Sequence, residues 1–118
     1  MATGTTNIIL QSITCVSTSE PGHDEVYIKH SEDGGREQRF PTSGYQSMAP
    51  RDVWNVALPL SFKDSVVVSL YDNDLGGDDF LGSHTYTPSD PQPEAVTVSN
   101  PKNGAVYSLY TVPAAAQG

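Results

Sequence analysis

A run of strand-forming residues that leads into an acidic turn constrains the fold of this chain most strongly. Residues 66–71 read Val-Val-Val-Ser-Leu-Tyr, and residues 72–79 read Asp-Asn-Asp-Leu-Gly-Gly-Asp-Asp. β-Branched and aromatic side chains in such a run are typical of a pleated, mostly buried strand. The four Asp residues repel one another, at roughly 1 kcal/mol per pair at 4 Å even in water. The stretch therefore predicts a core strand followed by either a solvated loop or a cation site.

The rest of the chain also carries the pattern of a β protein. No window places apolar residues at helical spacing over three turns, and ten Gly and nine Pro supply turns throughout. Strands are expected at 7–16, 24–31, 36–40, 52–58, 65–71, 81–87, 94–99 and 104–112. Turn signals recur between them at intervals of about ten residues, a spacing typical of sandwiches. The sequence therefore predicts an all-β fold, an antiparallel β-sandwich of about eight strands.

The length of the chain predicts a single domain over residues 1–118, with an ordered core over about 7–112. A chain of 118 residues can bury one modest core but not two. Trp54 is the only tryptophan, and its large side chain is expected to anchor that core. Residues 41–50 are expected to be irregular.

The charge and the lone cysteine narrow the classes of partner and the compartment. A net charge of −8 with only six Lys and Arg argues against nucleic acid as a partner. The single Cys15 lies in an apolar run and predicts a buried thiol without an internal disulfide. The sequence shows neither a signal segment nor an apolar run near 18 residues. We expect a soluble, cytoplasmic protein, or one exported by a route without a classical signal.

The acidic turn has the donor chemistry of a calcium site. Ca²⁺ takes six to eight oxygens at about 2.3–2.6 Å from carboxylates and carbonyls. Asp72 and Asp74 are two residues apart, so their side chains can converge on one ion with the Asn73 carbonyl between them. Two Gly residues then allow the chain to reverse, which lets Asp78 or Asp79 return to the same ion. Zinc is a poorer fit, because the loop contains neither His nor Cys.

These residues resemble a known calcium loop. A β-branched strand that ends in Asp-x-Asp, followed by a short loop and Asp-Phe-Leu-Gly, is similar to the third calcium loop of the C2 domain, the calcium-dependent module of protein kinase C and synaptotagmin. The resemblance implies that Asp72, Asp74 and Asp79 are ligands. Residues 20–29 resemble the first calcium loop of that family and imply Asp24 as a further ligand. The likeness covers about residues 7–112 in strand order, but its motifs occupy only about twenty positions.

Departures from the family pattern lower the expected number of ions. The third loop is one residue shorter than usual, and the first Asp of the first loop is missing, with Glu20 as the nearest carboxylate. The basic strand with which relatives bind phosphoinositides has no counterpart. We therefore predict one calcium site, with two possible. The predicted metal ligands are Asp24, Asp72, Asn73, Asp74, Asp78 and Asp79.

Other reactive residues predict no catalytic site. His23, His30 and His84 share no spacing, so surface positions or hydrogen-bonded roles are expected for them. No nucleophile elbow or oxyanion motif is present. The sequence therefore predicts a protein that is not an enzyme.

Three functions remain open at this point. The first is a calcium-binding, non-enzymatic β-sandwich that presents a calcium-dependent surface to a partner. The second adds a ligand bridged by the ion, either a phospholipid head group or a carbohydrate, with Leu75 as the one apolar residue of the acidic loop. The third is a structural or assembly protein in which calcium joins the copies. Composition does not define the oligomeric state.

Overall fold

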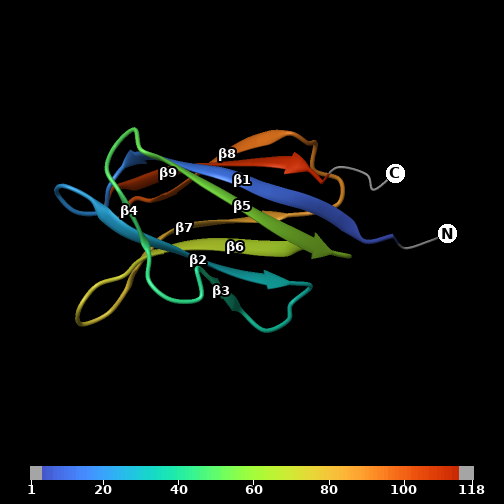
Figure 1. The fold of residues 1–118 in the computed structure, drawn as a ribbon, viewed down its shortest axis with the longest axis horizontal. Coiled ribbons are helices and arrows are strands. Elements are labelled where there is room, and N and C mark those ends of the chain that lie inside the picture. The colour runs from blue at the N-terminus through green and yellow to red at the C-terminus, as the bar shows by residue number, and fades with distance from the viewer. Residues whose placement is uncertain (1–3, 115–118) are drawn as a thin grey trace.

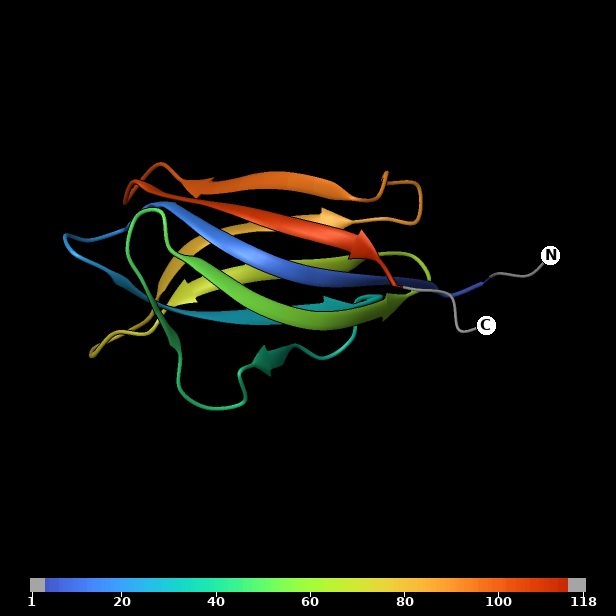
Figure 2. The same ribbon diagram turned by 45° about the horizontal axis from the view of Figure 1, so that its top comes forward.

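Two antiparallel sheets pack face to face in the computed structural model, which describes residues 4–114 (Figures 1 and 2). The strands are β1 (Thr6–Ser17), β2 (Asp24–Glu32), β3 (Gln38–Phe40), β4 (Gln46–Met48), β5 (Val53–Phe62), β6 (Val66–Asp72), β7 (Asp79–Tyr86), β8 (Glu94–Asn100) and β9 (Ala105–Pro113). The predicted antiparallel β-sandwich is confirmed, with nine strands in the described part of the chain instead of about eight. Residues 4–114 contain no helix long and apolar enough to cross a membrane.

The order of strands in the sheets differs from their order in the chain. One sheet runs β5-β1-β9-β8, and the other runs β3-β2-β6-β7 with the short β4 also paired to β2. Every pairing is antiparallel. Strands β7 and β8 are therefore consecutive in the chain but lie at the edges of different sheets.

The core lies between the two sheets and follows the alternation of the sequence. Along β5, for example, Val56, Leu58, Leu60 and Phe62 are buried while the residues between them are exposed. Trp54 is only partly buried and stacks on Phe40 with ring centroids 6.2 Å apart. Trp54 packs against the core as expected, but as a partly buried side chain outside the buried cluster. The largest fully buried side chains are Tyr86, Tyr107 and Phe62.

Strands β5 and β4 differ most from the sequence prediction, and in both cases the position of the strand in its sheet explains the difference. Strand β5 continues through Pro59 to Phe62, past the expected end at residue 58. It is an edge strand. Proline is tolerated there, because its nitrogen has no hydrogen to donate and can lie on the side of the strand that has no neighbour. The stretch 41–50 contains β4, which pairs with the first residues of β2. Three residues are too few to show an alternation, so this strand had no sequence signal.

The pairing of β2 with β6 determines where the acidic residues lie. In this antiparallel pair, Val26 near the start of β2 lies opposite Asp72 at the end of β6. The loop that precedes β2 and the loop that follows β6 therefore emerge at the same end of the sandwich. Figure 1 shows them together at the left end of the molecule, away from the start of β1 and the end of β9.

Candidate metal centre

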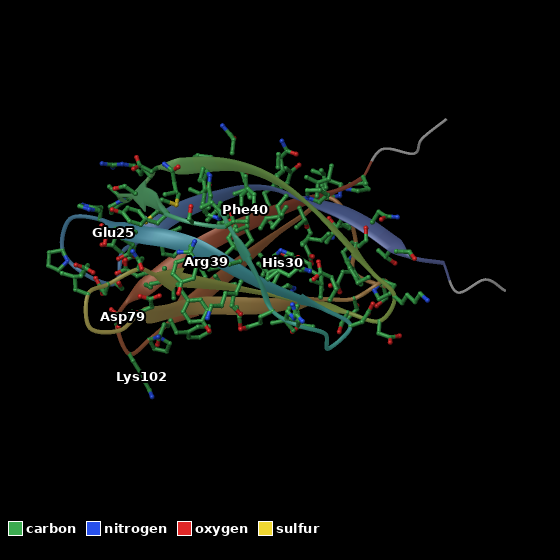
Figure 3. All side chains as sticks on the ribbon, turned by 60° about the horizontal axis from the view of Figure 1, so that its bottom comes forward. Glu25, His30, Arg39, Phe40, Asp79 and Lys102 are labelled. Atoms are coloured by element: carbon green, nitrogen blue, oxygen red, sulfur yellow. The ribbon has the colours of Figure 1, made fainter. Side chains whose placement is uncertain are left out.

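Loops 18–23 and 73–78 together form the candidate site. The Asn73 N–H donates to the Glu25 carbonyl (2.7 Å), which attaches the start of the second loop to β2. Gly76 and Gly77 have φ values of 88° and 135°, and only glycine adopts these readily. The chain reverses at this pair, so β7 begins with Asp79 directly opposite Asp72. Figure 3 shows Asp79 at the same end of the molecule as Glu25.

Four carboxylates converge between these loops. One oxygen from each of Glu20, Asp72, Asp74 and Asp79 lies within 4.8 Å of the others. Two ligands of one Ca²⁺ ion at about 2.3–2.6 Å can be at most about 5 Å apart. The four oxygens are thus close enough to share a single ion.

Mutual repulsion and burial make this cluster costly without a cation. Burial, with additional contributions from Glu20, Asp24 and Asp74, raises the pKa of Asp72 to about 7. A hydrogen bond with Asp79, followed by desolvation and the charge of Glu20, raises the pKa of Asp74 to about 6. A group whose pKa rises in this way is less stable in its charged form than in water. A bound cation would remove that penalty.

Asp24 lies beside the four carboxylates but is bonded to other groups. Its buried carboxylate accepts hydrogen bonds from Ser19 N (2.9 and 3.1 Å), Ser19 Oγ (2.7 Å) and Tyr107 Oη (2.6 Å). Ser19 Oγ also lies 3.2 Å from the Asp72 carboxylate. Burial and the bond to Asp24 raise the pKa of the Tyr107 phenol. In this geometry Asp24 holds loop 18–23 in place, and its role as a ligand stays a prediction.

Asp78 and Asn73, also predicted ligands, lie outside the four-carboxylate cluster. The Asp78 carboxylate accepts hydrogen bonds from the Tyr27 hydroxyl and from Asp74 N (3.1 Å). These two bonds, with the Tyr27 contribution larger, lower the pKa of Asp78. The backbone N–H of Asn73 is bonded to β2, whereas the predicted interaction uses its carbonyl. For both residues, ligation stays a prediction.

Glu20 belongs to the cluster although the sequence analysis left it outside the predicted ligand set. It is the carboxylate nearest to the missing first Asp of the family pattern, and this was the only available signal. Nothing in the local sequence directs its side chain toward Asp72, which is 52 positions away. The register of β2 against β6 brings the two together.

Comparison with solved structures identifies the fold. No protein-family model and no curated protein matches the chain. A C2 domain of plant Extended Synaptotagmin 1 superposes with a TM-score of 0.59 at 14% identity, covering 98% of this chain and 99% of that one. The C2 domains of Extended-Synaptotagmin 2 give 0.57 at 16% identity, covering 94% of this chain and 40% of that one.

Human GIVD cytosolic phospholipase A2 gives a TM-score of 0.59 at 15% identity over 92% of this chain. The chain spans only 16% of the length of that phospholipase chain. All of these identities are low, and the shared property is the fold. This chain has the fold of a C2 domain, in a divergent sequence, which confirms the structural side of the resemblance seen in its acidic motifs.

Proposed function

We propose that this chain is a non-catalytic module that binds one Ca²⁺ ion between loops 18–23 and 73–78. The observation that carries the proposal is the convergence of four carboxylates, from Glu20, Asp72, Asp74 and Asp79, within 4.8 Å of one another. The C2-type fold supports the proposal, because the cluster lies on the loops that the resemblance implies.

The donor set favours calcium over other common divalent ions. All four groups offer hard carboxylate oxygens, and none offers the nitrogen or sulfur that zinc prefers. Mg²⁺ requires near-ideal octahedral geometry at about 2.0–2.1 Å and retains its waters, whereas Ca²⁺ accepts irregular shells of six to eight oxygens. Four carboxylates leave coordination positions for water or for an oxygen of a partner. The ion would also neutralise a cluster in which burial and repulsion already oppose ionisation.

A phospholipid head group is the second candidate, as a ligand bridged by the ion. Leu75 is fully exposed at the tip of loop 73–78, next to the carboxylates. An exposed leucine beside a cation site can enter the apolar layer of a membrane while the ion contacts a lipid phosphate. The net charge of −8 makes such binding dependent on calcium, because an anionic surface repels the free protein.

Calorimetry combined with thermal unfolding tests calcium binding. We expect heat on adding Ca²⁺ and an increase in melting temperature relative to protein in chelator. A hundredfold excess over Kd adds about 2.7 kcal/mol, or about 10 °C for a domain of this size. Asp74→Asn and Asp79→Asn should reduce both effects. Asp64→Asn, which changes an exposed carboxylate outside the cluster, is the matched control.

Absence of heat and of a melting shift would refute the calcium proposal.

Sedimentation with phosphatidylserine vesicles, with and without Ca²⁺, tests the lipid proposal. Leu75→Ser is the variant expected to lose membrane binding but to keep calcium binding. Binding of the protein to a glycan array, without binding to vesicles, would indicate a carbohydrate ligand instead of a lipid. An increase in light scattering on adding Ca²⁺ alone would indicate assembly of copies.

A further inference from the structure

A second group of metal-ligating side chains lies at the other end of the sandwich. His84 on β7, Asp90 in the β7–β8 connection and Glu94 at the start of β8 each place one ligand atom within 4.8 Å of the others. His84 is five residues along β7 from Asp79, about 17 Å at the rise of an extended strand. Figure 1 shows the β7–β8 connection at the end opposite the acidic loops. The two clusters are therefore separate.

Three buried polar atoms at this location have no hydrogen-bond partner. They are His84 Nε2, Tyr86 Oη and Glu94 Oε1, and they are the only such side-chain atoms found in residues 4–114. Buried polar groups in folded proteins are almost always hydrogen-bonded. Three orphaned atoms gathered in one place indicate that something else satisfies them.

Tyr86 provides the independent sign of a missing ligand. Its side chain is fully buried, and its ring packs edge-on against His84 with centroids 4.5 Å apart. The nearby Thr111 hydroxyl donates to Gln92 Oε1 (2.8 Å) and makes no hydrogen bond of ordinary geometry to Tyr86.

Hydrogen bonds hold Asp90 in a fixed orientation, and neither Asp90 nor Glu94 has a Lys or Arg partner in the described part of the chain. Asp90 accepts bonds from Thr87 N (2.9 Å) and Thr87 Oγ1 (3.3 Å), which fix its direction. Each carboxylate oxygen has two lone pairs, so acceptor capacity remains. Among the described residues, the ion pairs are Lys29–Glu37 and His30–Glu32, and neither involves this group. No Lys or Arg side chain of residues 4–114 therefore forms an ion pair with Asp90 or Glu94.

We propose that His84, Asp90 and Glu94 form a binding site for a divalent transition-metal ion, with Zn²⁺ as the best fit. One imidazole nitrogen and two carboxylate oxygens are ligands that zinc takes at about 2.0–2.2 Å in a tetrahedron. Mg²⁺ and Ca²⁺ prefer oxygen alone. Three protein ligands leave the fourth position for water, to which the Tyr86 hydroxyl can hydrogen-bond. The ion would join the edge strands of the two sheets.

Histidine NMR on the full chain tests this site directly, because there are only three histidines. Zinc-free protein is kept in excess Ca²⁺, which occupies the acidic loops if they bind it, and is titrated with ZnCl₂. We expect the ring resonances of His84 to move to those of a metal ligand through Nε2, with His23 and His30 unchanged. The melting temperature should rise in the same titration.

Variants separate this site from other zinc-binding groups. His84→Ala and Glu94→Gln should weaken Zn²⁺ binding by at least about tenfold, since even outer-shell partners contribute 10–100-fold. His23→Gln, at an exposed position, and Asp74→Asn, in the acidic loops, should leave it unchanged. The wild-type NMR titration decides the matter if a variant fails to fold. Unchanged His84 resonances, or zinc binding that survives both ligand variants, would overturn the proposal in favour of a buried water.

Discussion

Replacing Asp72 by Asn is expected to stabilise the calcium-free protein while it weakens calcium binding. The Asp72 carboxylate is buried and accepts a hydrogen bond from Glu25 N (2.7 Å), with Ser19 Oγ at 3.2 Å. An Asn side chain can keep both contacts, because its carbonyl accepts from Glu25 N and its amide donates to Ser19 Oγ. The substitution therefore removes the charge and little else.

The magnitude follows from the pKa of Asp72 in the folded protein. Burial, with the contributions of Glu20, Asp24 and Asp74, raises this pKa from 3.8 to about 7. Such a rise corresponds to an upper limit of about 4 kcal/mol. We expect about 1–2 kcal/mol, because the carboxylate is inaccessible but lies at a loop end, where the surrounding solvent screens its charge. Between these pKa values the folded state binds more protons than the unfolded state. The contribution of Asp72 to the stability of the calcium-free protein therefore falls as the pH rises from about 4 to 7 and changes no further above that.

Urea unfolding in chelator, followed through the fluorescence of Trp54, measures the effect. We expect Asp72→Asn to exceed the wild type by about 1–2 kcal/mol at pH 8 and by clearly less at pH 5, where the folded wild type is itself protonated. In excess Ca²⁺ the order should reverse. Asp64→Asn should show no comparable dependence on pH. An Asp72→Asn protein that is less stable than the wild type at pH 8, or whose advantage is equal at both values, would contradict this reasoning.

Three further predictions concern the packing and the acidic loops. Gly82→Ala should lower the free energy of unfolding in urea by about 2–4 kcal/mol. The added Cβ would lie 2.9 Å from Ser99 N, and Gly82 has a φ of +147°. Gly4→Ala is the control and should be neutral, because its Cβ would have no atom within 4 Å. Tyr27→Phe removes the hydroxyl that bonds to Asp78. The pKa of Asp78 should then rise toward its ordinary value in a carboxylate NMR titration. An unchanged pKa would mean that another group lowers it. Calcium binding at pH 7 should release protons from the four-carboxylate cluster, seen as a heat that depends on the ionisation enthalpy of the buffer; equal heats in two buffers would argue against it.

The alternation of side chains made most of the fold predictable. A residue buried in a sheet has its neighbours on the opposite face, so period-two patterns locate strands without knowledge of their partners. The pattern predicted β6 almost to the residue, from 65–71 against Val66–Asp72. It did not predict β4, a three-residue strand that exists only because β2 has a free edge beside it. The extent of β5 past Pro59 likewise depends on its edge position.

The candidate calcium site was also only partly predictable from the sequence. Asp72, Asp74 and Asp79 lie within one turn, so local spacing was enough to bring them together. Glu20 reaches the cluster only through the pairing of β2 with β6. Asp24 bonds to the nearby Ser19 and, because the two sheets pack face to face, to Tyr107 on β9. The register of β2 against β6 depends on the whole sheet. No local feature of residues 20–24 distinguishes a ligand from a carboxylate that supports the loop.

The sequence by itself determined that this chain is a β-sandwich with an acidic turn after a core strand, because both features depend on residues close together in the chain. Only the tertiary structure decided which carboxylates meet and which are bonded to other groups. The group of His84, Asp90 and Glu94 has no recognisable spacing, since its members come from edge strands of two different sheets and from the connection between them. Packing of one sheet on the other brings them together, and this depends on the apolar core of the whole chain.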